Sequence, residues 1–508
     1  MEFNTRSRKL NAMLASSSGV FQQLIQIIGN FGYRTIFLMV FSKEYLGING
    51  LFTNILQLFS ITELGIGTAI LYSMYKPFTE YDSKKISALV RFYKRVYYMV
   101  AGVVLVLGLS FYPFIESLVD ISEVPADVNL RVVYLLFVLE SVAGYLVAYR
   151  FSILQADQRL HVTTLFNCGQ LLFGYAVRAS VLLLTRDYET VLLAGILSDV
   201  LLNWLFSRWI VHKYAFILKE TGEVTREEKN TIYKNTFALL CHKIGSIVVT
   251  STDNIILTKY VSLVATGMYS NYSTIVLAIT NIANRVFSGI LPSVTNYTIS
   301  NEKQETYQLF KRILFGNLWI SSFTTVCLYV LLNPFIELWL DESFLFEGSV
   351  VAAICLQHYL SVSRLTANIF VNSTGLFSRD KIRPLIESTI NLTVSIVLVK
   401  KIGIVGVFVG TCVSGMLTYY WREPYLVFKN FFGKGIGRYW AAQGAWLVLT
   451  LVICWGLASI CALLPNTLFA FVVKMLIAGL GSNAIILLCT FWTDEWKYFL
   501  GLVMRKIK

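Results

Sequence analysis

The sequence predicts an all-α polytopic membrane protein with about fourteen transmembrane helices, arranged as two six-helix lobes plus two C-terminal helices. Three observations predict this fold class: the composition, a series of apolar runs of helical length, and an internal repeat. The 508 residues are 56% hydrophobic and only 14% charged, and the mean hydropathy is +0.62. Because a soluble domain carries roughly 25% charged residues, a chain this apolar must lie in lipid.

The apolar runs give the predicted helices. A spanning helix needs about 20 mostly apolar residues, and the first run is expected to be a retained helix, since no small-x-small cleavage site follows it. The candidate spans are residues 15–40, 48–74, 92–114, 129–152, 162–184, 190–211, 235–258, 262–290, 313–335, 348–372, 384–400, 402–421, 440–464 and 467–491.

Three short motifs recur in the same order about 220 residues further along the chain. Each copy of the repeat holds six predicted helices, an even number, so both copies insert into the membrane the same way up. Such halves are related by an axis along the membrane normal, with the working cavity between them. The motif pairs are Gly50-Leu51-Phe52-Thr53-Asn54 with Gly267-Met268-Tyr269-Ser270-Asn271, Lys94-Arg95 with Lys311-Arg312, and Pro113-Phe114-Ile115-Glu116 with Pro334-Phe335-Ile336-Glu337.

The repeat divides the chain into four predicted segments. Residues 1–212 form an N-lobe of helices 1–6, and residues 235–430 form a C-lobe of helices 7–12. Between them, residues 213–234 form a cytoplasmic linker whose mixed charges are typical of a solvated hinge. Residues 431–508 carry helices 13 and 14 and the tail, which have no counterpart in the first half.

The loops predict the orientation of the chain. Lys and Arg lie at the ends of the apolar runs, and roughly five times as many lie on the side of the N-terminus as on the other side. Both termini are therefore predicted to be cytoplasmic in a multi-pass plasma-membrane protein. The same bias accounts for the net charge of +13, so no nucleic-acid partner is expected.

The chain carries no sign of an enzyme. It has no Gly-x-x-x-x-Gly-Lys-Ser/Thr motif and no His-Glu-x-x-His motif, and its eight cysteines lie within apolar runs, as small apolar side chains do. These features favour a secondary transporter without a cofactor, in which Na+ or H+ is a candidate coupling ion. A membrane glycan polymerase is a rival, but it usually needs a large outside loop, and the longest here, around 115–128, is short and acidic.

Cations within the predicted spans are candidate binding residues. A charge in the bilayer costs about 2.5–3.5 kcal/mol and tends to face a cavity or a partner. Our hypothesis is that five such cations line a central cavity and hold a bulky anion, because a guanidinium matches phosphate oxygens. The alternative is that each is neutralised within its own lobe, for example by Glu63, Glu140 or Asp199. The five are Lys243, Arg285 and Arg364 in an inner layer, and Arg34 and Arg178 in an outer one.

Acids and amides within the spans are the other candidate site residues. Asp253 follows three hydroxyl residues and could bind a sodium ion or a proton, or it could anchor Lys259; Glu63 and Asp199 are further acidic candidates. Amides on helices 1 and 8 could hydrogen-bond a sugar, or they could serve as interhelical contacts, as could Gly406-x-x-x-Gly410. The amide candidates are Gln26, Asn30, Asn281 and Asn284.

Two stretches resemble a known family. Asp253-Asn254-Ile255-Ile256-Leu257, followed by Gly267-Met268-Tyr269-Ser270-Asn271-Tyr272, resembles the seventh and eighth helices of polysaccharide-repeat-unit flippases. Leu46-Gly47-Ile48-Asn49-Gly50-Leu51 and Glu63-Leu64-Gly65-Ile66-Gly67 resemble the matching first-lobe stretch. These flippases belong to the multidrug/oligosaccharidyl-lipid/polysaccharide exporter superfamily, and the resemblance covers roughly residues 10–430.

The resemblance implies two six-helix lobes and alternating access. It also implies that the cargo is an undecaprenyl-diphosphate-linked oligosaccharide, moved from the inner to the outer leaflet for capsule or another surface polysaccharide, with a polysaccharide polymerase as a possible partner. A multidrug or metabolite antiporter of the same fold is the nearest alternative, although it would favour an acid-rich cavity. A non-transporting scaffold for cell-wall synthesis is a further alternative.

Overall fold

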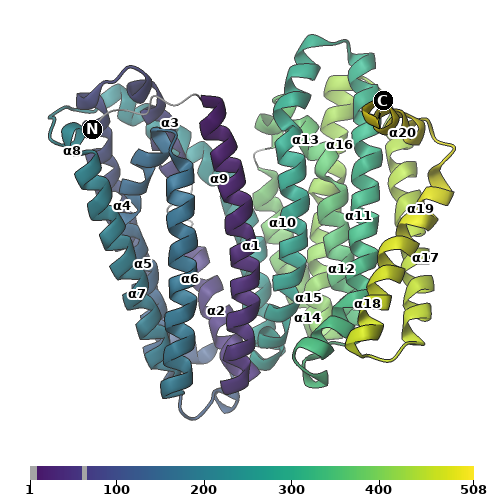
Figure 1. Cartoon of the computed structure of the whole chain (residues 1–508), viewed down its shortest axis with the longest axis horizontal. Coiled ribbons are helices and arrows are strands. Elements are labelled where there is room, and N and C mark those ends of the chain that lie inside the picture. The colour runs from purple at the N-terminus through teal and green to yellow at the C-terminus, as the bar shows by residue number, and fades with distance from the viewer. Residues whose placement is uncertain (1–7, 60–65, 381, 508) are drawn as a thin grey trace. The chain divides into compact units, whose positions relative to one another are not determined.

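The computed structural model describes residues 8–59, 66–380 and 382–507, and these residues form helices and no strand (Figure 1). The predicted all-α fold class is therefore confirmed. The first helices are α1 (Arg8–Val40), α2 (Lys43–Phe59), α3 (Ile66–Thr79), α4 (Ser83–Phe111), α5 (Leu130–Ala156), α6 (Leu160–Thr185), α7 (Tyr188–Lys213), α8 (Ala215–Leu218) and α9 (Arg226–Tyr260). The others are α10 (Leu263–Ser300), α11 (Lys303–Trp339), α12 (Gly348–Ser363), α13 (Leu365–Ser373), α14 (Arg383–Ile402), α15 (Ile404–Leu417), α16 (Tyr419–Val427), α17 (Gly437–Ala462), α18 (Leu468–Leu476), α19 (Ser482–Thr490) and α20 (Asp494–Ile507).

Many of these helices are suited to crossing a membrane. Within the described residues, ten helical segments are long and apolar enough to span one, which makes the chain a multi-pass membrane protein. They coincide with ten of the predicted spans, and the total of fourteen stays a prediction. Helix α1 is not among the ten, because glutamines and an asparagine lower its hydropathy.

Polar side chains fix where several helices begin. Asn129 accepts hydrogen bonds from the backbone N–H groups of Arg131 and Val132 at the start of α5, and Asp187 accepts one from Thr190 in the first turn of α7. Thr225 and Glu228 form a capping box at the start of α9. Each cap satisfies N–H groups that the helix itself leaves without partners.

The chain divides into two compact units, Met1–Gly267 and Met268–Lys508. In the first unit, α1 packs on α6, and α5 and α6 both pack on α7. In the second, α11 packs on α12 and α17, and α14 packs on α15. Helix α9, which the sequence analysis assigned to the second lobe, packs on α2 and α3 and belongs to the first compact unit. The predicted four-segment division by lobes stays a prediction.

Glycines allow two close helix crossings. A Cβ atom on Gly406 would lie 2.4 Å from the carbonyl group of Leu398, so α15 can lie directly against the backbone of α14. In the first unit, a Cβ atom on Gly47 would lie 2.2 Å from the carbonyl oxygen of Leu263, and one on Gly267 would lie 2.0 Å from that of Lys43. Small residues at such positions let helix backbones approach closely.

The predicted linker is held against α4 by its backbone, while charged side chains such as Lys219, Glu223 and Glu227 are exposed. The Ser87 hydroxyl donates to the carbonyl oxygen of Glu220 at 2.8 Å, and the Arg91 guanidinium donates to that of Gly222 at 2.9 Å. Lys85 forms an ion pair with Glu228. Pattern analysis missed this docking because the donors come from α4, more than a hundred residues earlier in the chain.

Candidate functional site

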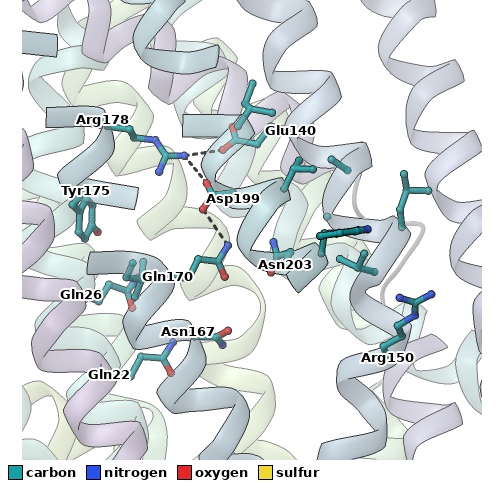
Figure 2. Close-up of a pocket in the computed structure, with 18 of the residues that line it drawn as sticks. Gln22, Gln26, Glu140, Arg150, Asn167, Gln170, Tyr175, Arg178, Asp199 and Asn203 are labelled. Atoms are coloured by element: carbon teal, nitrogen blue, oxygen red, sulfur yellow. Dashed lines mark hydrogen bonds and ion pairs between the residues drawn. The ribbon is translucent and has the colours of Figure 1, made fainter. Parts of the chain in front are cut away.

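The first compact unit contains a polar cavity of about 780 Å³ between α1, α5, α6 and α7, to which α4 adds Tyr98. Figure 2 shows carboxamides and charged groups from these helices around it. Each helix is mostly apolar, so polar side chains at matching heights gather where the helices face one another. The polar and aromatic lining residues are Gln22, Gln26, Tyr98, Glu140, Arg150, Asn167, Gln170, Tyr175, Arg178, Asp199, Asn203 and Trp204.

One guanidinium joins two carboxylates in this cavity. An Nη atom of Arg178 lies 2.7 Å from a carboxylate oxygen of Asp199 and 3.2 Å from one of Glu140 (Figure 2). The Gln170 amide donates to the other Asp199 oxygen at 3.0 Å. Arg178 and Asp199 are each about three-quarters buried, where charge-assisted hydrogen bonds are stronger than in water.

Glycines make the room that the Arg178 side chain occupies. A Cβ atom on Gly195 of α7 would lie 2.4 Å from Arg178 Nε, and one on Gly174 of α6 would lie 2.9 Å from its Nη1. The guanidinium therefore lies against bare backbone, within reach of Asp199 one helical turn beyond Gly195. The absence of a side chain at Gly195 is what allows the ion pair to form in this position.

Arg34 and Arg178, the two predicted outer cations, line one further cavity of about 250 Å³ in the same unit. Asn30 and Glu140 also line it, and Glu140 borders the larger cavity as well. The structure thus brings the predicted residues Asn30, Arg34 and Arg178 together in this cavity. Asp199 joins them through its ion pair with Arg178. For Arg178, the alternative reading of neutralisation by Glu140 and Asp199 describes the observed contacts.

In the second unit, Arg364 lies at the junction of α12 and α13. Its guanidinium lies 3.4 Å from Glu423, whose side chain is only 1% exposed, and over the ring of Tyr419 at 4.0 Å. Arg383 lies 3.6 Å from the same carboxylate. Arg364 is thus part of an ion-pair network with α14 and α16, which the sequence analysis did not predict.

The other predicted residues are more scattered. Arg285, Asn281 and Asn284 are exposed on α10 of the second unit, and Asp253 is buried in α9 of the first. Gln26 lines the larger cavity described above. Glu63 and the side chain of Lys243 lie outside the described residues, so the predicted inner layer of Lys243, Arg285 and Arg364 stays a prediction.

Sequence reasoning missed Asn167, Gln170 and Asn203, although a signal for them was present. Gln170 and Arg178 lie three and eleven residues after Asn167 along α6, which places all three on one face of the helix. Asp199 and Asn203 are one turn apart on α7. A stripe of polar residues on an otherwise apolar helix predicts a buried polar site. On α6 and α7 the sequence analysis named only the charged residues, Arg178 and Asp199.

A family model supplies the assignment. The model described as "Polysaccharide biosynthesis protein" matches residues 11–298, which is more than half of the chain. The chain belongs to this polysaccharide biosynthesis family. The predicted membership is confirmed, and no sequence among curated proteins matches the chain.

Solved structures share the fold of this family member. The lipid II flippase MurJ in an inward closed conformation matches with a TM-score of 0.65 at 15% identity, covering 94% of this chain and 98% of that one. A multidrug resistance MATE family transporter of the MOP superfamily, in an inward-facing conformation, matches with a TM-score of 0.55 at 12% identity, covering 82% and 98%. The Vibrio cholerae MATE transporter VcmN matches with a TM-score of 0.52 at 12% identity, covering 84% and 99%.

These similarities establish the class of protein. The chain has the fold of flippases and multidrug transporters, and its family and fold match transporters rather than enzymes. At such identities the similarity extends to the fold and not to the cargo.

Proposed function

We propose that this protein is a flippase for an undecaprenyl-diphosphate-linked oligosaccharide, which it moves from the inner to the outer leaflet by alternating access. The observation that carries the proposal is the lining of the cavity in the first unit, which combines carboxamides with aromatic rings in a chain of the polysaccharide biosynthesis family. The lipid II flippase that shares the fold supports a lipid-linked glycan as cargo.

The chemistry of this lining suits a sugar. Asn and Gln side chains both donate and accept hydrogen bonds, as sugar hydroxyl groups do, and five of them line the cavity, namely Gln22, Gln26, Asn167, Gln170 and Asn203. Tyr175 and Trp204 add aromatic faces, against which the C–H groups of a pyranose ring can pack. Polar groups that converge beside aromatic and aliphatic side chains fix the orientation of a bound ligand.

The ion-pair cluster is the candidate coupling group. Two carboxylates, Glu140 and Asp199, share the single guanidinium of Arg178, so one negative charge is left over when both are ionised. A proton or Na+ that binds there would weaken one ion pair and change the packing of α5 against α6 and α7. A carboxylate that exchanges a proton or Na+ in this way would also serve the second candidate function, a cation-coupled multidrug antiporter.

The test measures lipid-linked repeat units on each side of the membrane in cells that make the parent surface glycan. Deletion should cause inner-leaflet accumulation, and wild type should relieve it. The double variant Asn167→Ala/Asn203→Ala should relieve it poorly, whereas the control Asn301→Ala, a partly exposed asparagine directly after α10, should match wild type.

Two outcomes would overturn parts of this proposal. A deletion strain without accumulation, but with raised sensitivity to cationic drugs, would replace the flippase with the antiporter. Full relief by the double variant would keep the flippase and remove the cavity of the first unit as its sugar site.

A further inference from the structure

A separate cavity of about 590 Å³ lies in the second unit, where α14 begins and α15 passes into α16. The transport proposal does not use it. Its lining combines guanidinium groups with apolar side chains. The residues that matter below are Arg379, Arg383, Arg422, Ile386, Leu417 and Trp421.

The charges around this cavity are not balanced. Arg383 is held by Asp380 at 2.6 Å and by Glu387 at 2.6 Å. Arg379, by contrast, donates to the neutral side-chain oxygen of Asn430 at 2.6 Å. Arg422 Nε lies 3.9 Å from Asp380, beyond hydrogen-bond distance.

With Arg364 and its partner Glu423 included, four guanidinium groups in this network face three carboxylates, those of Asp380, Glu387 and Glu423. The surplus positive charge lies at the cavity, on Arg379 and Arg422. The Arg379 side chain is exposed and that of Arg422 is 36% exposed, so both can reach a ligand.

The other side of the cavity is apolar and open. Ile386, Leu417 and Trp421 line it and are 51%, 56% and 42% exposed. A free anion in water would gain nothing from this wall, whereas a lipid could lay its chain along it. Tryptophan and arginine together are typical of the headgroup level of a membrane, and basic pockets between transmembrane helices bind anionic headgroups.

We propose that this cavity binds the phosphate of an anionic membrane lipid. The Arg379 and Arg422 guanidinium groups donate to the phosphate oxygens, for which their planar fork is suited, and the lipid chain lies along Ile386, Leu417 and Trp421. The phosphate belongs to a glycerophospholipid or to a polyprenyl phosphate. The site does not depend on the transport function proposed above.

The experiment measures lipid binding to the purified full-length protein, by native mass spectrometry and in phosphatidylcholine nanodiscs. Phosphatidylglycerol and a polyprenyl monophosphate are the two probes. The double variant Arg379→Gln/Arg422→Gln should bind the preferred probe about tenfold or more weakly, because each basic residue near a headgroup adds to its affinity. The control Arg131→Gln/Arg312→Gln removes the same charge from arginines that lie over Tyr112 and Tyr498.

The outcomes distinguish a glycerophospholipid from a polyprenyl phosphate as the bound lipid. Phosphatidylglycerol binding that is lost in the double variant but kept in the control assigns a glycerophospholipid, and the same pattern with the polyprenyl phosphate alone assigns that carrier. If neither probe binds, or if both variants weaken binding equally, the proposal is overturned. A thermal unfolding midpoint equal to that of wild type shows that the double variant is folded, which is expected because both side chains reach the surface. Failure of the leaflet assay above would leave this result unaffected.

Discussion

At the scale of single residues, the position of the Arg178 guanidinium depends on a missing side chain. The substitution Gly195→Ala would place a methyl group 2.4 Å from Arg178 Nε, so the guanidinium would have to leave Asp199. We expect a loss of about 1–3 kcal/mol of unfolding free energy, as for other overpacked sites, and weakened transport. Thermal unfolding and the leaflet assay measure these effects. Gly169→Ala on α6, where a Cβ atom would meet nothing within 4 Å, is the matched control, and a similar result for both variants would contradict this account.

Arg364 belongs to an ion-pair network, which changes how its substitution must be read. Arg364→Ala should destabilise the protein by about 1–3 kcal/mol, because it removes a partner from the buried carboxylate of Glu423. The double variant Arg364→Leu/Glu423→Gln should recover much of that stability, since the buried charge is gone. Chemical denaturation or thermal unfolding distinguishes the two. If the double variant is less stable than Arg364→Ala, the ion pair is not the reason for the loss.

The pairing of Arg178 with Glu140 and Asp199 could not be predicted from the sequence. Depth along a helix follows from position, so the sequence correctly places Arg178 in an apolar span. Which acid faces it depends on the rotation of α5, α6 and α7 about their axes. In a membrane both faces of a helix are apolar, so the hydrophobic pattern fixes rotation poorly. Glu140 and Asp199 could therefore be named only as possible partners.

At the scale of elements, the packing of α15 on α14 depends on Gly406 and Gly410. A Cβ atom on Gly406 would lie 2.4 Å from the Leu398 backbone, and one on Gly410 would lie 2.7 Å from Ser395 Cα. Since backbone cannot move aside as a side chain can, Gly406→Ala should force the two helices apart and lower the thermal unfolding midpoint. Gly444→Ala on α17, with nothing within 4 Å, should leave the midpoint unchanged or raise it. Equal midpoints for the two variants would contradict the close crossing.

The positions of the helices along the chain were largely predictable, but which helices pack against one another was less so. Apolar runs predicted the spans because a helix in lipid must be apolar along its length. The C-terminal α20 was missed because its apolar residues cover only one face, which packs on α11 through the stacked rings of Trp496 and Trp319 at 5.2 Å. Likewise, the contact of α9 with α2 and α3 follows from tertiary packing, of which the sequence carries no local sign.

At the scale of the whole molecule, the predicted orientation can be tested with single reporter cysteines. Cys489 is the exposed one among the seven described cysteines, so Cys489→Ser removes the exposed thiol of this set, and the variant without a reporter cysteine measures the remaining labelling. Ser122→Cys, in the loop after α4, should react with a membrane-impermeant maleimide in intact cells, because its loop is acidic and predicted to be outside. Asn230→Cys, at the start of α9, should react only after permeabilisation. The reverse pattern would place both termini outside and contradict the positive-inside prediction.

The fold class and the family were accessible from the sequence because they depend on composition, periodicity and motifs. The cavity in the first unit was not, because its lining comes from α1, α4, α5, α6 and α7. Gln26 was named from its own helix, but Asn203 belongs to the site only through neighbours far away in the sequence. The linker docked on α4 was hidden for the same reason.

The crossing of Gly47 and Gly267 has a consequence for symmetry. These glycines lie in or beside the two copies of the repeated stretch, and each faces the carbonyl oxygen of a residue just before the other, Leu263 and Lys43. The contact is self-complementary, like the isologous interface of a two-fold dimer, but it is built within one chain. A substitution at either glycine separates the same two backbones. Alanine at both should therefore cost less than the sum of the single losses, and the resulting coupling energy would measure a dimer-like contact inside a single chain.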